Sequence, residues 1–327
     1  MQAVTDAFLR EQLEERRRKL VAAYQPQGRT KRIELLLDEV DAALERMRLG
    51  TYGLCETCHD PVERDRLIAD PLICFCLDHL TATEQKSLER DLELAAQIQK
   101  GLLPQSHLSL STWEADFHYD AAGLVSGDYC DLIATEDGEI CLLFGDVSGK
   151  GVAASMLMAQ LHAIFRALAT QNLPVDHLVG RANALFCAST LADSYATLVC
   201  AKTMPAGIQL CNAGHCPPLV LRPGHLDRLE ATGLPVGITC QSEYEVIRLS
   251  LAAGESLVLY TDGLTEACDA AGNEYGEERL SQLLSRLPAI TPAELIRACT
   301  QDLNAFLKGN KRNDDLAIMA LQRKRRF

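Results

Sequence analysis

Apolar residues recur every three or four positions along the first fifty residues, which is the spacing of one face of an α-helix. The pattern covers residues 6–24 and 30–49. Between them, Tyr24–Gly28 contains proline and glycine, which disfavour a continuing helix. The sequence therefore predicts an antiparallel helical hairpin. The basic run Arg16–Lys19 is interpreted as a solvated helix face, and contact with an acidic partner is the alternative.

A third helical pattern covers residues 81–103 and ends at Pro104. Its apolar seam alternates steps of four and three, as in a coiled coil: Leu88, Leu92, Ala95, Gln99 and Leu102. Because the stretch holds only about three heptads, a single amphipathic linker helix packed on its own domain is the alternative. The coiled-coil interpretation would allow a homodimer through this segment.

Beyond Ser111 the pattern changes to short strands that cluster apart from pairs of helices. The predicted strands are 113–121, 129–134, 140–146, 195–202, 208–212, 218–222, 244–249, 256–261 and 316–322. The predicted helices are 151–169, 175–189, 276–287 and 292–307. This grouping predicts an α+β fold in which two antiparallel sheets are flanked by helices, an α/β/β/α sandwich.

Composition narrows the class of protein. The chain has 327 residues, enough for about two domains. Its formal net charge of -13 argues against a protein that wraps nucleic acid. It has no apolar run of the roughly 18–20 residues that span a membrane, and its first residues lack the pattern of a secretion signal. We therefore expect no membrane association and a cytoplasmic location, where most of the 13 cysteines are small core residues.

A zinc-binding pattern follows the hairpin. Cys55 and Cys58 have two residues between them, and Cys76 and His79 have the same spacing after an interval of seventeen residues. Two such pairs can place four donors around one structural zinc ion. Cys74 is the alternative to Cys76. His59 is a weaker candidate because it adjoins Cys58.

These residues resemble a known family. The segments Asp41–Glu45, Gly50–Cys55, Arg66–Leu67 and Cys76–His79 look like the DksA/TraR zinc finger with its preceding coiled-coil hairpin, over roughly residues 6–82. His79 stands where the family usually has a fourth cysteine. Because the hairpin tip near residues 25–32 lacks the acidic pair by which DksA acts on RNA polymerase, the resemblance implies a sensing or docking module.

Aspartates also stand at the ends or starts of four predicted strands, beside glycines in most cases: Asp128, Asp146, Asp262 and the pair Asp314 and Asp315. Carboxylates gathered in one place raise each other's pKa and need cations. Hard oxygen donors without nearby histidine favour Mg or Mn, and two such ions can promote attack of water on phosphorus. For each aspartate alone, a turn or helix cap is the alternative.

The glycine-rich stretch Gly145–Gly151 does not have the spacing of a phosphate-binding P-loop, because three residues instead of four separate Gly145 and Gly149 and a glycine follows Lys150. The sequence also lacks a Gly-x-Ser-x-Gly nucleophile motif and a His-Glu-x-x-His zinc motif. Metal-assisted hydrolysis of a phosphate ester therefore remains the chemistry that the aspartates favour.

Residues 93–322 resemble the RsbU and stage II sporulation protein E type of metal-dependent protein serine/threonine phosphatase. The matching motifs are Glu93–Gln99 with Leu102–Pro104, Ser126–Tyr129, Gly145–Gly151, Asn212–His215, Tyr260–Glu266 and Asp314–Leu316. The resemblance implies two Mn or Mg ions held by Asp128, Asp146, Asp262, the Val147 carbonyl and one of Asp314 and Asp315, with Asp314 preferred.

By the same resemblance, Asp131 is a weaker ligand candidate. Lys150 meets substrate phosphate or caps the turn, and Asn212 and His215 shape a loop. The implied domains are residues 1–80 (hairpin and zinc finger), 81–104 (linker helix) and 105–327 (phosphatase).

The implied substrate is phosphoserine or phosphothreonine on a small regulatory protein, such as a STAS-type anti-sigma-factor antagonist, with the zinc module regulating activity through the linker helix. The competing class is a transcription-regulatory binding protein that acts on RNA polymerase through the zinc module.

Overall fold

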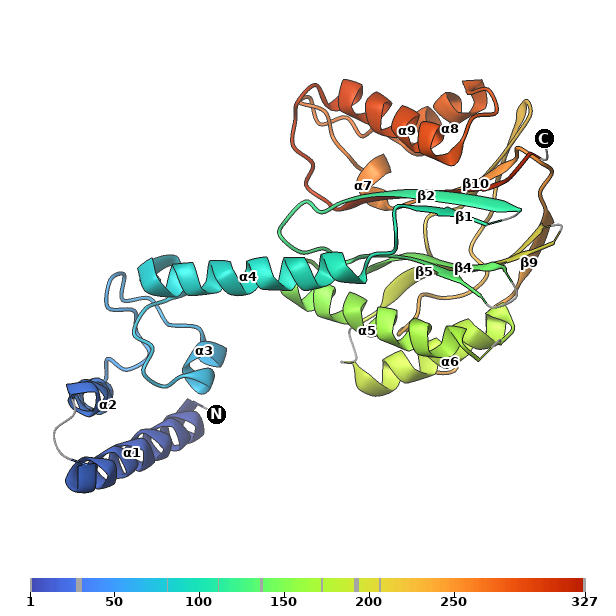
Figure 1. Ribbon diagram of the computed structural model, residues 1–327. Helices are drawn as coiled ribbons and strands as arrows, with labels where there is room; N and C mark the ends of the chain where they lie inside the picture. The colour runs from blue at the N-terminus through green and yellow to red at the C-terminus, as the bar shows by residue number, and fades with distance from the viewer. Residues whose placement is uncertain are drawn as a thin grey trace. The chain divides into compact units, whose positions relative to one another are not determined.

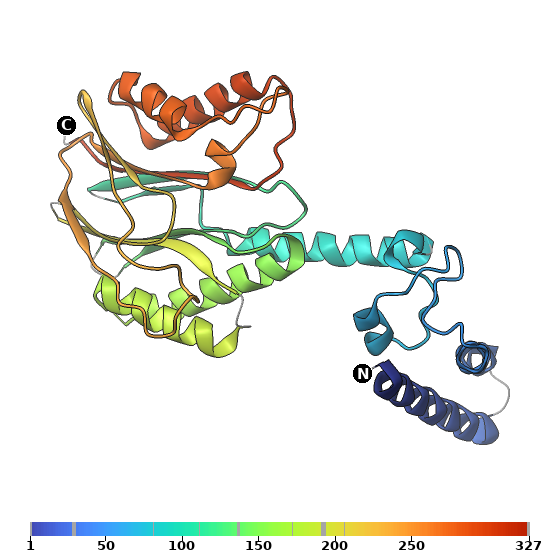
Figure 2. The ribbon, with the colours of Figure 1, turned by 180° about the vertical axis from the view of Figure 1, so that it is seen from behind.

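A computed structural model of the protein describes residues 2–27, 31–80, 82–110, 112–135, 138–171, 173–190, 194–205 and 207–325. The chain divides into two compact units, Met1–Asp91 and Leu92–Phe327. The ribbon is shown from two sides in Figures 1 and 2.

The smaller unit is built from helices and a cysteine-bearing loop. Helices α1 (Gln2–Gln27) and α2 (Lys31–Leu49) pack on each other through the buried side chains of Leu13, Val40 and Ala43. Helix α1 ends three residues later than predicted, so residues 24–27 of the predicted break are helical, and Gly28, its last residue, lies outside the described residues. The short helices α3 (Arg64–Ala69) and η1 (Leu77–His79), which the sequence pattern did not predict, follow in the loop.

Helix α4 (Ala82–Leu102) begins in the smaller unit and ends in the larger one. Its last turns carry Gln99, whose side chain is buried in the larger unit. The helix matches the predicted segment 81–103, of which Thr81 lies outside the described residues.

The larger unit contains two antiparallel sheets. One has the strand order β3-β4-β5-β6-β9, and the other has the order β1-β2-β11-β10-β7-β8. The first sheet is formed by β3 (Asp128–Ala134), β4 (Ile140–Val147), β5 (Ala196–Met204), β6 (Gly207–Ala213) and β9 (Ile247–Ser250). The second is formed by β1 (His107–Ser109), β2 (Trp113–Asp120), β7 (Leu219–Arg222), β8 (His225–Arg228), β10 (Ser256–Tyr260) and β11 (Leu316–Arg323).

Helices cover the outer face of each sheet, as Figure 1 shows. The first sheet is covered by α5 (Gly151–Ala169) and α6 (Val175–Ser189). Beside the second sheet lie α7 (Asp262–Thr265), α8 (Glu277–Arg286) and α9 (Pro292–Leu307). The predicted α+β class and the two helix-flanked antiparallel sheets are therefore confirmed.

Alternation along β4 shows how the layers are held together. Leu142 and Phe144 face the core between the sheets, whereas Cys141 and Leu143 face α5 and α6, because successive strand residues point to opposite faces. Strand β4 is therefore apolar on both sides. This pattern is expected of a strand that is buried between two layers.

Helix α5 is long and apolar enough to span a membrane by length and composition alone, the one such helix among the residues described. It packs against β3, β4 and α6 through Met158, Leu161 and Phe165. The core helix of a globular unit passes the same test.

Some sequence expectations were incomplete. The short strands β1 and β8 and the single turn α7 were not predicted, and the strand expected at residues 244–249 is β9 at Ile247–Ser250. Elements of three or four residues offer too few positions for a periodic pattern to emerge. Among the scattered cysteines, Cys130, Cys141, Cys200, Cys211 and Cys299 are buried as expected, but Cys240 is exposed.

Candidate metal centres

The first two predicted aspartates are direct neighbours across β3 and β4. Asp128 begins β3 and pairs in register with Asp146 near the end of β4. Opposite residues of an antiparallel pair have side chains on the same face of the sheet, with Cβ atoms about 4.5–5.5 Å apart. By the alternation of β4, this face is the one turned toward the second sheet.

The other aspartates come from the second sheet. Asp262 follows the end of β10 as the first residue of α7, and Asp314 and Asp315 immediately precede β11, the hydrogen-bonded neighbour of β10. Glycines allow these segments to meet. A Cβ on Gly263 would lie 1.7 Å from the Asp315 carbonyl oxygen, and one on Gly127 would lie 3.1 Å from the Asp146 carboxylate. Each sheet therefore brings aspartates to the same end of the sandwich.

Burial and neighbouring carboxylates raise the pKa of three of these aspartates. Burial raises the pKa of Asp128 well above its ordinary value, and Asp146 and Asp315 raise it further. Burial and the neighbouring Asp262 and Asp314 raise the pKa of Asp146 to about 7. The pKa of Asp262 is also raised by burial and by Asp314. We call these five residues, Asp128, Asp146, Asp262, Asp314 and Asp315, the aspartate centre.

Hydrogen bonds fix Asp128 from both sheets. The Thr261 hydroxyl donates to Asp128 Oδ2 at 3.1 Å and accepts the Ala317 N–H at 2.9 Å. The Asp128 N–H donates to Ser126 Oγ at 3.0 Å. Gln99 of α4 then holds Ser126 from both sides, donating to its carbonyl at 2.6 Å and accepting its N–H at 3.0 Å. Helix α4 is thus bonded to the segment that carries Asp128.

The two adjacent aspartates are held differently. Asp315 accepts the backbone N–H groups of Ala122 at 2.8 Å and Gly127 at 3.1 Å. Asp314 Oδ2 accepts from the exposed Lys150 ammonium at 2.8 Å. The backbone amides that bind Asp315 are fixed by the fold, whereas the flexible Lys150 side chain can move away from Asp314. Asp314 therefore has the more easily freed oxygen, and Asp315 acts at least as a clamp between loops.

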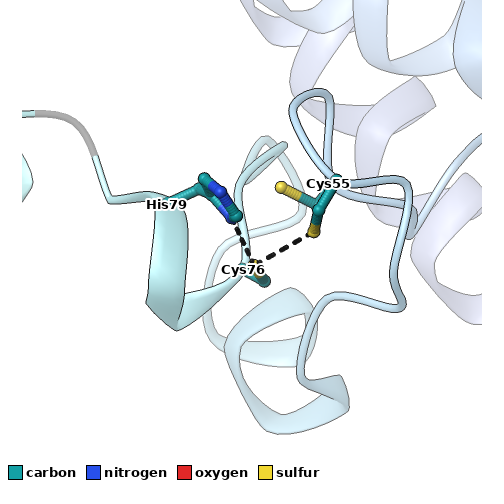
Figure 3. A group of neighbouring side chains, drawn as sticks. Cys55, Cys76 and His79 are labelled. Carbon is teal, nitrogen blue, oxygen red and sulfur yellow. Dashed lines mark hydrogen bonds between the residues drawn. The ribbon is translucent and has the colours of Figure 1, made fainter.

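The smaller unit brings together the other predicted ligand set. The Cys55, Cys58 and Cys76 sulfurs and one His79 ring nitrogen all lie within 4.8 Å of one another. Figure 3 shows Cys55, Cys76 and His79 turned toward one another. Among the described residues this group includes neither Cys74, the predicted alternative, nor His59.

Distances within this cluster suit one tetrahedral ion. Cys58 Sγ and Cys76 Sγ are 3.7 Å apart, close to the roughly 3.8 Å that two zinc–sulfur bonds of about 2.3 Å give at a tetrahedral angle. Cys76 Sγ lies 3.3 Å from His79 Nδ1. Although burial raises the pKa of Cys55, the backbone N–H groups of Cys58, Cys76 and Thr57 lower it to about 6. Cys55 is therefore set up to be a thiolate, the form that binds metal.

Comparison with known proteins decides the family. A family model described as Stage II sporulation protein E (SpoIIE) matches residues 136–324, more than half of the chain. The chain belongs to the SpoIIE family. Protein IcfG of Synechocystis is 27% identical over 264 residues, which cover 71% of this chain and 41% of IcfG. Phosphoserine phosphatase RsbP of Bacillus subtilis is 30% identical over 185 residues, which cover 54% of this chain and 46% of RsbP.

The chain thus spans less than half the length of these two relatives. A third relative, phosphoserine phosphatase RsbU of B. subtilis, is 23% identical over 244 residues, which cover 73% of this chain and 72% of RsbU. A protein serine/threonine phosphatase is the enzyme class that these relatives support.

Solved structures show the same fold. The PP2C domain of SiaA from Pseudomonas aeruginosa matches with a TM-score of 0.62 at 19% identity, over 75% of this chain and 99% of that one. The catalytic domain of the serine/threonine phosphatase PstP, solved in complex with two manganese ions, matches with a TM-score of 0.50 at 14% identity, over 65% and 99%. The larger unit of this SpoIIE-family chain therefore has the PP2C fold.

The residues present suit hard divalent cations. The donors are carboxylates, and burial together with neighbouring carboxylates raises the pKa of Asp128, Asp146 and Asp262, an effect that a bound cation would oppose. A Cβ added to Gly127 would lie 3.0 Å from the Val147 carbonyl oxygen. A residue without a side chain therefore borders the predicted carbonyl ligand. In this SpoIIE-family protein, the chemistry of the donors fits Mg or Mn.

Asp131, the weaker ligand candidate, lies outside the aspartate centre. Its buried carboxylate accepts two bonds from the Arg166 guanidinium of α5, at 2.7 Å and 2.6 Å, and lies 3.6 Å from His162 Nε2. It lies three residues beyond Asp128, so it points to the helix-covered face of the sheet. Asp131 therefore joins β3 to α5.

Asn212 and His215 close a turn, as the sequence interpretation expected. The Asn212 side chain accepts the His215 N–H at 2.8 Å and donates to the His215 carbonyl at 3.1 Å. His215 Nδ1 lies 2.8 Å from the Thr197 hydroxyl, and burial lowers the pKa of His215 to about 4. A neutral, fully enclosed imidazole suits a structural role.

Sequence reasoning missed the supporting residues. Thr261 and Gln99 lie inside motifs that the sequence shows, but their neighbours along the chain do not reveal what they bond. The available signal was the placement of a polar Gln99 on the apolar seam of a predicted helix. A buried polar side chain needs a partner, and here the partner is the backbone of Ser126.

Proposed function

We propose that this protein is a metal-dependent protein serine/threonine phosphatase that acts on a phosphorylated regulatory protein in the cytoplasm. The observation that carries the proposal is the aspartate centre, where carboxylates at the strand ends of two sheets, together with burial, raise the pKa of Asp128 and Asp146. The names of the relatives RsbP and RsbU, both phosphoserine phosphatases, support the substrate class.

We assign Asp128, Asp146, Asp262 and Asp314 as catalytic metal ligands, with Asp315 as the alternative to Asp314 and the Val147 carbonyl as a further donor. Two Mn or Mg ions held there would supply an activated water and neutralise charge on the phosphate. The manganese pair in PstP supports this assignment. Thr261 and Ser126 keep Asp128 in place, and the exposed Lys150 can turn from Asp314 toward an incoming phosphate.

We propose that Cys55, Cys58, Cys76 and His79 bind one structural zinc ion in a DksA/TraR-type module. The 3.7 Å and 3.3 Å distances between its donors support this assignment. The domain boundaries that follow are residues 1–80 for the hairpin and zinc module, 81–104 for the linker helix and 105–327 for the phosphatase domain. A STAS-type anti-sigma-factor antagonist is the partner we propose as substrate.

Regulation would pass through α4. Gln99 bonds the Ser126 backbone two residues before Asp128, and the Leu102 backbone is a hydrogen-bond partner of His162 on α5. A signal received by the zinc module, or a homodimer formed through α4, could shift this helix. The shift would move Asp128 through Ser126, and α5 through His162.

Hydrolysis of p-nitrophenyl phosphate with and without Mn²⁺ tests the catalytic proposal. We expect turnover that depends on Mn²⁺ and is lost in Asp146→Asn. Turnover that Asp146→Asn leaves unchanged would refute the metal assignment. A wild-type protein that is folded and loaded with Mn²⁺ yet inactive on both aryl phosphate and phosphoproteins would favour a transcription-regulatory binding protein.

A separate measurement tests the zinc. Purified protein should contain about one zinc per chain by elemental analysis, and Cys55→Ser should lose it. A structural zinc ion contributes roughly 10–16 kcal/mol to folding of small zinc modules, so limited proteolysis should then cut the smaller unit first. Cys74→Ser is the matched control, because Cys74 lies outside the ligand cluster. Zinc loss in Cys74→Ser with retention in Cys76→Ser would overturn the ligand set.

A further inference from the structure

A pocket of about 420 Å³ lies beside the aspartate centre in the larger unit. Asp314, Asp315 and Lys150 form part of its wall. Apolar side chains from three separate segments form another part: Leu92 of α4, Leu124 of the loop before β3, and Val152 of α5. Its volume falls in the range of roughly 300–1,000 Å³ that is usual for pockets that hold ligands.

Two of the apolar side chains at this pocket are exposed to solvent. Leu124 is 55% exposed and Val152 is 45% exposed, and Met156, one turn further along α5, is 68% exposed. Single exposed apolar residues are ordinary on a protein surface, but a group beside a candidate reaction centre marks a place where another molecule binds.

Charged residues also line this pocket. Lys150 lies there, bonded to Asp314 and to the Asn313 carbonyl at 3.2 Å, with 69% of its side chain exposed. Arg312 also lines the pocket, but it is mostly buried and forms an ion pair with Asp120. A ligand that contacts both Lys150 and the apolar lining residues therefore combines a phosphate with a neighbouring apolar group.

We propose that this pocket holds an apolar side chain of the substrate protein, close in sequence to its phosphorylated residue; this inference rests on the phosphatase function proposed above. The aspartate centre receives the phosphate, so the flanking residues of an extended segment, about 3.3–3.6 Å apart, pass the shared wall at Asp314. A leucine, isoleucine, valine or methionine at a flanking position is buried against Leu124 and Val152. A charged side chain that packs against Leu124 and Val152 loses part of its hydration to apolar surface.

Because Leu92 of α4 lines the pocket, the preference for an apolar flanking residue is linked to the proposed regulation through α4. Leu92 lies seven residues before Gln99, two helical turns away on the same side of α4. The residue that lines the pocket and the residue that holds Ser126 therefore move together. A displacement of α4 changes the pocket and the placement of Asp128 at the same time.

Synthetic phosphoserine peptides test the proposal. Each peptide carries a single leucine at one position from four residues before to four residues after phosphoserine, in a glycine and serine background. With Mn²⁺ present, we expect one or two positions where leucine raises kcat/KM roughly 10- to 100-fold over serine. Leu124→Ser and Val152→Ser should bring that ratio toward one. Leu185→Ser replaces a similarly exposed leucine on α6, outside the pocket, and should keep the ratio.

A binding measurement separates the pocket from the phosphatase function. Labelled peptides with a phosphonate in place of phosphoserine are followed by fluorescence anisotropy on wild type and Leu124→Ser. Tighter binding of the leucine peptide to wild type, lost in Leu124→Ser, supports the pocket even for a protein that hydrolyses nothing.

Equal binding and turnover of leucine and serine peptides at every position, in a protein that hydrolyses aryl phosphate, would overturn the proposed pocket. The proposed phosphatase function would then remain. A wild-type dimer that Leu124→Ser turns into a monomer also overturns the pocket, because a second copy then fills the surface.

Discussion

Asp128 and Asp131 lie three residues apart on the same strand, and both are almost fully buried, yet their surroundings are opposite. Asp131 points toward the helix-covered face and receives two hydrogen bonds from Arg166. Asp128 points toward the other sheet, where it faces Asp146 across the strands and has a hydroxyl donor in Thr261. One carboxylate is neutralised by the chain itself, and the other is surrounded by further carboxylates.

The difference separates a structural carboxylate from a candidate ligand. A buried charge costs several kcal/mol unless a partner compensates it. Asp131 has its partner in the folded chain, so its role is complete without an added ion. The raised pKa of Asp128 records a cost that a divalent cation would remove. Burial alone does not distinguish the two residues, but the charge of the neighbours does.

The largest effect we predict concerns activity. Asp128→Asn should reduce Mn²⁺-dependent hydrolysis of p-nitrophenyl phosphate by about a thousandfold or more, because a metal centre supplies several kcal/mol of transition-state stabilisation and each 1.4 kcal/mol is tenfold. Asp131→Asn should retain the activity of its folded fraction. Equal losses in the two variants would remove the distinction between these carboxylates.

The second prediction concerns stability at the Asp131 pair. Arg166→Met leaves a fully buried carboxylate without its cation, and we expect a loss of roughly 3–5 kcal/mol in the free energy of unfolding. Asp131→Asn leaves a guanidinium that is 44% exposed and can reach water, so its cost should be smaller, about 2 kcal/mol. Urea unfolding followed by fluorescence suits this test, since the single tryptophan, Trp113, is buried in the larger unit. A smaller loss for Arg166→Met than for Asp131→Asn would contradict the pairing.

The local sequence pattern predicted which aspartates lie at the ends of strands. Asp128, Asp146 and Asp262 follow or begin apolar strands, and such strands show their ends through the change from apolar to polar residues. The strand pairing that sets Asp128 opposite Asp146 depends on register between distant segments. The aspartates at strand ends indicated that their side chains converge, and the family resemblance supported this, but the local pattern does not give the register.

Other features were outside the reach of local patterns. The sequence shows Asp131 and Arg166 35 positions apart, with nothing to indicate that a strand and a helix would bring them together. Similarly, β1 and β8 are three and four residues long and exist because neighbouring strands offer hydrogen bonds to them. Contacts that only the tertiary structure creates cannot be predicted from periodicity.

The third prediction concerns a substitution that should stabilise the metal-free protein. In protein free of Mn²⁺ and Mg²⁺ at neutral pH, Asp128→Asn should raise the free energy of unfolding by about 1–2 kcal/mol, because it removes a carboxyl group whose ionised form burial and Asp146 disfavour. Addition of Mn²⁺ should stabilise wild type and leave the variant nearly unchanged. Tryptophan fluorescence in urea, with and without Mn²⁺, measures both effects. Destabilisation of the metal-free protein by Asp128→Asn would place this residue in the same class as Asp131.

The smallest effect concerns a second compensated carboxylate, Asp302 of α9. Arg279 donates to it at 2.7 Å and 3.0 Å and Tyr275 at 2.8 Å, and the Arg279 bonds lower the pKa of Asp302. A lowered pKa in the folded state means that this stabilisation is present above the ordinary aspartate pKa and is lost as pH falls through the folded value. Asp302→Asn should therefore lower the free energy of unfolding by about 1 kcal/mol at pH 7, a small effect because solvent weakens a partly exposed pair. The effect should become progressively smaller below pH 4, as Asp302 is protonated. Thermal unfolding of both proteins between pH 3 and pH 7 measures the difference. Curves that stay parallel over the whole range would show that Arg279 does not compensate Asp302.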